Sequence, residues 1–102
     1  MTESEFHGAV DAVLARIESS LDDDDLDIDL ESGILTITSE DGAKVIINRQ
    51  TPNREIWVAA RSGGFHFRFV GGEWRDTRSA DELFASLARV IESQAGIKPR
   101  WK

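Results

Sequence analysis

Ten residues decide the fold: Asp22 to Glu31, which read DDDDLDIDLE. In them, four consecutive aspartates lead into a strict alternation of apolar and acidic residues. Alternation with a period of two predicts a half-buried strand over residues 26–31, with Leu26, Ile28 and Leu30 facing the core and the carboxylates facing outward. The aspartate run predicts the end of the preceding helix, because adjacent like charges repel and aspartate side chains compete for backbone hydrogen bonds.

An amphipathic helix is predicted before this boundary. Its apolar residues recur every three or four positions, which is the spacing of one helical face. They are Phe6, Val10, Val13, Leu14, Ile17 and Leu21. The helix is therefore expected to run from Phe6 to the aspartate run.

A second helix is predicted near the other end of the chain. Ser79 and Glu82 have the spacing of a capping box, and Gly96 suits a helix end. The apolar stripe between them consists of Leu83, Phe84, Leu87, Val90 and Ile91. Residues 97–102 are expected to form a short, loosely held tail.

Five further strands are predicted between the two helices, with Asp41-Gly42 as a hairpin turn. Their ranges are 34–38, 43–48, 55–60, 65–70 and 73–75. No repeat or linker-like stretch interrupts the chain, so residues 1–102 are expected to form one domain. The fold class predicted is α+β: a two-layer α/β sandwich with two helices on one face of an antiparallel sheet of five to six strands.

The face of the sheet without helices is expected to carry a tryptophan among polar residues. Alternation places Asn48, Gln50, Trp57, His66 and Arg68 on this face. A tryptophan in a strand is more often in the core, and a shift of one residue in register would bury Trp57. Ile56 and Val58 already supply the inner face, however, so we expect Trp57 to face outward and contact a partner. His66 is expected to pack beside Trp57.

Composition excludes several classes of function. Cysteine is absent, so the chain has no disulfide, no thiolate nucleophile and no sulfur ligand for an iron–sulfur cluster. The net charge of −7 argues against nucleic acid and anionic membranes as partners. The first residues are acidic where a secretory signal is basic, and no apolar run approaches the roughly 20 residues of a membrane span, so a cytoplasmic location is expected. With only two histidines and no recognisable nucleophile, no enzymatic activity is expected.

Acidic residues are concentrated in the first third of the chain. Residues 1–31 hold eleven acids and one base, a balance of −10, whereas residues 32–102 hold eight acids and eleven bases, a balance of +3. On a helical projection His7, Asp11, Glu18 and Asp22 share one stripe. The carboxylates of the first strand would continue that stripe into one acidic ridge. Such a ridge is either a solvated face, a cation-binding surface or a docking surface for a basic partner.

If the ridge binds metal, oxygen ligands with His7 at the margin suit hard cations such as ferric iron, magnesium, calcium or manganese, with ferrous iron also plausible. Binding is expected to be weak, because exposed carboxylates form no cage. An EF-hand loop starting at Asp23 is excluded, since Ile28 stands where that loop needs glycine and Ile34 where it needs glutamate.

The sequence from Ile47 to Trp57, INRQTPNREIW, together with the acidic helix and strand before it, resembles the frataxin family. The stretches Ser4 to His7 and Gly63 to Phe67, with Trp74, are similar to its bacterial branch. This resemblance implies weak iron binding along the ridge and a role in iron–sulfur cluster assembly, in which a cysteine desulfurase and a scaffold protein are the partners. The residues to which it carries a metal role are Glu18, Asp22, Asp23, Asp25, Asp27, Asp29 and Glu31, with His7 less securely. Those to which it carries a partner role are Asn48, Gln50 and Trp57.

Three hypotheses remain open. In the first, the chain binds iron on its ridge and regulates cluster assembly or donates iron to it. In the second, the ridge is an electrostatic adaptor that docks on the desulfurase, and metal binding is incidental. In the third, the chain is a separate acidic chaperone or DNA mimic that does not use the sheet face. We expect a monomer, with metal-dependent oligomers as the alternative.

Overall fold

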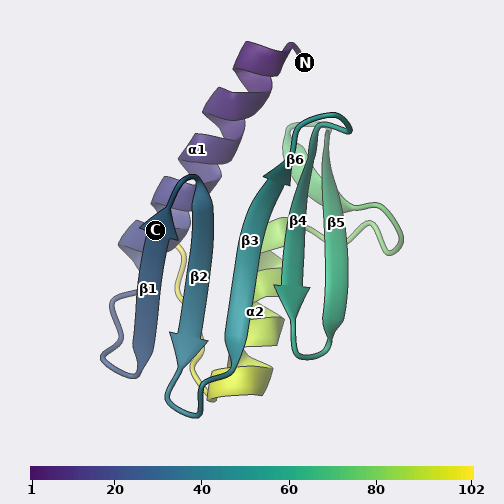
Figure 1. Cartoon of the computed structure of the whole chain (residues 1–102). Helices are drawn as coiled ribbons and strands as arrows, with labels where there is room; N and C mark the ends of the chain where they lie inside the picture. The colour runs from purple at the N-terminus through teal and green to yellow at the C-terminus, as the bar shows by residue number, and fades with distance from the viewer.

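The computed structural model describes residues 1–102. Figure 1 shows both helices behind one face of a single sheet, whose other face is open. In chain order the elements are α1 (Glu3–Ser20), β1 (Leu26–Glu31), β2 (Ile34–Ser39), β3 (Lys44–Gln50), β4 (Glu55–Ala60), β5 (Gly63–Val70), β6 (Glu73–Asp76) and α2 (Leu83–Ala95). The predicted two-layer sandwich is confirmed, with six strands.

Every strand of the sheet pairs antiparallel with its neighbours in the chain, in the order β1-β2-β3-β4-β5-β6. The hairpin between β2 and β3 turns at Asp41-Gly42, as predicted. Asp41 stabilises this turn, because its carboxylate accepts hydrogen bonds from Ser39 Oγ at 2.8 Å and from the Ala43 backbone N–H at 3.1 Å. These bonds, led by the one from Ala43, hold the pKa of Asp41 below its usual value.

The core lies between the sheet and the two helices. Its fully buried side chains include Phe6, Val10 and Ile17 from α1, Leu35, Ile37, Ile47, Ile56 and Phe67 from the sheet, and Leu83, Leu87 and Ile91 from α2. The predicted alternation holds, but burial fades along β1 from buried Leu26 through half-buried Ile28 to Leu30, which is 40% exposed. Since β1 is an edge strand, its side chains have a neighbouring strand on one side only.

The helix starts differ from the prediction. The capping box is at α1, which begins at Glu3: the Thr2 hydroxyl accepts from the Glu5 N–H, and the Glu5 carboxylate accepts from the Thr2 N–H. The capping box predicted from Ser79 and Glu82 is wrong. Glu82 is itself the N-cap of α2, and its carboxylate accepts the N–H groups of the first turn. Ala80 lies in the left-handed region (φ +66°), so the chain turns between Ser79 and Glu82 and cannot start a helix at Ser79.

The prediction of a loosely held tail is also wrong. The Trp101 indole packs edge-on against Phe84, with ring centroids 5.1 Å apart, and its N–H donates to the Phe84 carbonyl at 2.9 Å. The Lys102 N–H donates to Ser20 Oγ, and the Lys102 carbonyl accepts from Arg16 Nε. The tail therefore joins the end of α1 to the start of α2. Neither helix has both the length and the hydropathy that crossing a membrane requires.

Candidate functional site

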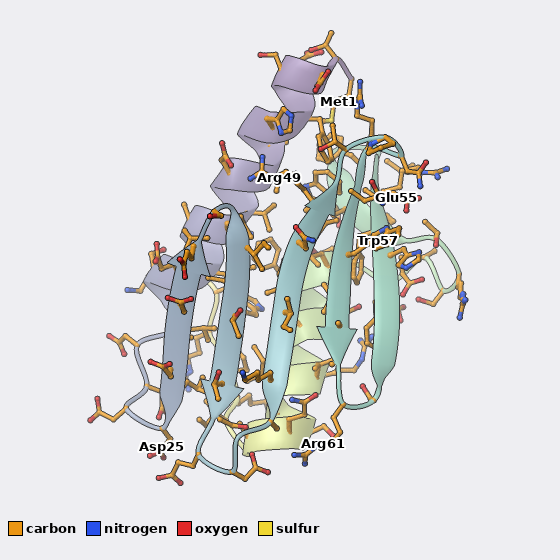
Figure 2. All side chains as sticks on the ribbon, in the orientation of Figure 1. Met1, Asp25, Arg49, Glu55, Trp57 and Arg61 are labelled. Carbon is orange, nitrogen blue, oxygen red and sulfur yellow. The ribbon has the colours of Figure 1, made fainter.

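The acidic ridge, defined as Glu18, Asp22, Asp23, Asp25, Asp27, Asp29 and Glu31, is exposed throughout. It follows the end of α1, the turn after it and the outer side of β1, with Asp25 at the foot of that strand in Figure 2. On β1, Asp27 and Asp29 stand opposite uncharged Thr38 and Thr36 of β2. None of the seven carboxylates forms an ion pair, although five arginine–carboxylate ion pairs occur elsewhere in the chain. The carboxylates of the ridge therefore have no ion-pair partner within the chain.

The ridge carboxylates do not converge on a single point. No group of three histidine or acidic side chains is close enough to hold one metal ion. Same-face residues of a strand lie about 7 Å apart, so a cation at β1 would meet one or two carboxylates and complete its shell with water. The residues fit a hydrated hard cation bound weakly, and they do not fit a closed metal centre.

A cleft of about 590 Å³ borders one end of the ridge. Asp22 to Asp25 line it together with Lys98 to Arg100. No ion pair joins Lys98 or Arg100 to these aspartates. The aspartate run therefore stays exposed to solvent.

His7 belongs to a different cluster. Its Nδ1 lies 2.9 Å from Arg49 Nη1, and its Nε2 lies 3.6 Å from a Glu3 carboxylate oxygen. The same guanidinium donates to Asp11 at 2.5 Å. Figure 2 shows Arg49 reaching from the sheet toward α1. A metal ion at His7 would face this cation, and therefore the structure gives no support to the metal role predicted for His7, which stays a prediction.

The predicted partner residues lie together on the open face of the sheet. Asn48, Trp57 and His66 stand opposite one another on β3, β4 and β5. Trp57 is half-buried, and its ring stacks on His66 with centroids 4.3 Å apart and an interplanar angle of 9°. The expected packing of His66 beside Trp57 is therefore observed. Gln50 lies in the next row, opposite Glu55.

Glu55, which the sequence places on the outward side of its strand, was not among the predicted partner residues. It is only 5% exposed, and its carboxylate accepts hydrogen bonds from Trp57 Nε1 at 2.8 Å and from Arg68 Nη2 at 2.7 Å. The bond from Trp57, followed by the bond and charge of Arg68, holds the pKa of Glu55 below its usual value against the effect of burial. The sequence could have indicated this ion pair only through the register of β4 against β5, which places Glu55 opposite Arg68.

The ridge on β1 and the Trp57 surface occupy the same face of the sheet. Asp29 pairs with Thr36, Thr36 with Ile46, and Ile46 with Ala59, two residues from Trp57 on β4. Three strand spacings separate β1 from β4, which is roughly 14 Å. One partner protein can therefore contact both surfaces.

Comparisons with known proteins agree with this architecture. The model of the frataxin-like domain matches residues 1–97. The chain is 53% identical over 98 residues to the iron-sulfur cluster assembly protein CyaY of Paraburkholderia phymatum, covering 94% of this chain and 93% of that protein.

Solved structures show the same fold. Frataxin from Psychromonas ingrahamii superposes with a TM-score of 0.90 at 34% identity, covering 96% of this chain and 95% of that one. Trimeric frataxin from the yeast Saccharomyces cerevisiae, complexed with ferrous iron, superposes with a TM-score of 0.65 at 26% identity, covering 93% and 86% of the two chains. The chain therefore belongs to the frataxin family.

Proposed function

We propose that this chain is an iron-binding protein of iron–sulfur cluster assembly, which regulates the process or donates iron by docking its acidic ridge on a cysteine desulfurase and its scaffold protein. The observation that carries the proposal is the ridge itself, seven exposed carboxylates without one ion pair. The carboxylates of such a surface repel one another, and a bound cation or a basic protein surface relieves that repulsion. The relatives named for cluster assembly and the yeast frataxin complexed with ferrous iron support the choice of iron and of this process.

In this proposal the chain contributes surfaces rather than catalysis. The ridge residues Asp22 to Glu31 would attract a hydrated iron ion or basic side chains of the desulfurase. Asn48, Gln50 and Trp57 would contact the assembly complex from the same side of the sheet. The cytoplasmic location stays a prediction. The trimeric yeast neighbour supports oligomers as a second state beside the expected monomer.

A second function is favoured by one observation. Because no three ridge groups converge on a metal position, the ridge could act mainly as an electrostatic docking surface, with metal binding incidental. Attraction between exposed opposite charges weakens once salt shortens the Debye length, which is about 10 Å at 0.1 M. The two functions therefore differ in how iron and salt affect the desulfurase complex.

The test is calorimetric binding to purified cysteine desulfurase, with and without ferrous iron, at low and high salt. A ridge variant, Asp27→Asn with Asp29→Asn, is compared with Glu73→Gln, which removes an acid from the opposite edge strand. We expect the ridge variant to bind at least tenfold more weakly at low salt and the control to bind like the wild type. Binding that is equally tight for both variants at every salt concentration would refute docking through the ridge. An affinity that iron leaves unchanged would favour the adaptor function.

A further inference from the structure

A buried carboxylate lies on the open face of the sheet. Glu55 points to the same side as Asn48 and His66, which are exposed, yet only 7% of its side chain is accessible. Burying an ionised carboxylate is costly unless hydrogen bonds and an opposite charge compensate it. Its neighbours on the open face supply both.

Each oxygen of the Glu55 carboxylate has its own donor. Oε1 accepts from the Trp57 indole N–H at 2.8 Å, and Oε2 accepts from Arg68 at 2.7 Å. His66 Nδ1 is 4.0 Å from Oε1. The three partners lie on β4 and β5, outside the hydrophobic core cluster. The contacts of Glu55 therefore fix this surface rather than the interior.

Two constraints act on the indole of Trp57. Glu55 holds its N–H, and the nearly parallel ring of His66 covers one of its faces. The ring of His66 leaves a partner the other ring face and the ring edge, on the side of Asn48, which stands opposite Trp57 on β3. A side chain fixed in this way loses little conformational entropy when a partner binds.

We propose that Glu55 is a positioning residue for the partner surface: it orients the indole of Trp57 and occupies its N–H, so that a partner protein contacts the ring of Trp57 and not its hydrogen-bond donor. The second half of this inference rests on the proposed docking function. The first half concerns the free protein alone.

The first test measures the indole N–H of Trp57 by NMR in the free protein, with Trp57→Phe used to assign it. Glu55→Ala is expected to speed hydrogen exchange of this N–H by about fivefold or more, as loss of one hydrogen bond implies. Glu55→Gln retains one acceptor oxygen and should give an intermediate rate. Arg68→Gln is the matched control, because it removes the other donor and leaves the Trp57 bond in place. Unchanged exchange in folded Glu55→Ala would overturn the inference.

The second test measures affinity for purified cysteine desulfurase. Glu55→Ala and Trp57→Ala are expected to weaken binding by similar factors, whereas Trp57→Phe, which keeps a ring without an N–H, should bind within about threefold of the wild type. If Trp57→Phe bound as weakly as Trp57→Ala, the partner would use the N–H and the inference would fall. If exchange rose in Glu55→Ala but Trp57→Ala bound like the wild type, positioning would stand and the sheet contact of the proposed function would be refuted.

Discussion

Replacing Asp29 by asparagine is expected to stabilise the fold, although the side chain is exposed. Asp29 lies between Asp27 and Glu31 on the outer side of β1, and its cross-strand partner is uncharged Thr36. None of the three acids has a basic partner. Removing the central charge therefore relieves two repulsions and breaks no ion pair.

The size of the effect follows from the strand geometry. Each neighbouring carboxylate lies about 7 Å away, which gives roughly 0.6 kcal/mol of repulsion per pair in water. At 0.1 M salt, with a Debye length of about 10 Å, screening halves this value. Relief of two pairs should then raise the free energy of unfolding by about 0.6 kcal/mol and the melting temperature by roughly 2–5 °C.

The assay is thermal and urea unfolding of Asp29→Asn at 0.02, 0.1 and 1 M salt. The gain should shrink as salt rises. Glu73→Gln is the matched control, because it removes one acid that pairs with Arg75 at 3.0 Å, and it should be neutral or slightly destabilising. An Asp29→Asn protein no more stable than the wild type at 0.02 M salt would mean that the ridge charges do not crowd one another.

Three further predictions concern other parts of the molecule. Because its folded-state pKa is lowered, Glu55 contributes stability that is present above its unfolded pKa of about 4.3 and is lost as pH falls through the folded pKa. In urea unfolding between pH 3 and 6, the free energy of unfolding should therefore depend less steeply on pH for Glu55→Gln than for the wild type. Equal pH slopes for the two proteins would contradict this. Trp101→Ala should lower the free energy of unfolding by about 2 kcal/mol, since it removes the ring packed on Phe84; a loss under about 0.5 kcal/mol would show that the tail is not held in solution. Arg49→Met keeps the apolar stem but frees Asp11, and it should cost about 1 kcal/mol; urea unfolding that gave no loss would refute a tether between α1 and β3.

Periodicity was sufficient to predict the sandwich. The apolar stripes of the helices and the alternation of residues 26–31 indicate which side of each element faces the core. This side can be predicted because it depends only on the local geometry of a helix or a strand. Local spacing could not show which of two capping-box patterns in the sequence forms a capping box. Thr2 and Glu5 form the box, while Ser79 and Glu82 have the same spacing but are interrupted by the left-handed turn at Ala80.

The features that the sequence did not predict depend on contacts between segments that are distant in the chain. Burial of Glu55 depends on Arg68 arriving from the next strand, and placement of His7 depends on Arg49 reaching α1 from β3. The order in the tail likewise depends on Trp101 meeting Phe84. None of these pairings has a signature in local spacing. The exposure of the acidic ridge could be predicted, because it needs only the alternation along β1 and the position of the aspartate run.

The most direct test of the account is an anaerobic titration of the isotopically labelled protein with ferrous iron, followed by NMR. Paramagnetic broadening is expected to begin at the resonances of Asp22 to Glu31 and to leave Trp57 and α2 sharp at low iron. Asp27→Asn with Asp29→Asn should reduce this broadening. Resonances of Asp22 to Glu31 that stay sharp while others broaden, or broadening that is unchanged in this variant, would contradict iron binding at the ridge.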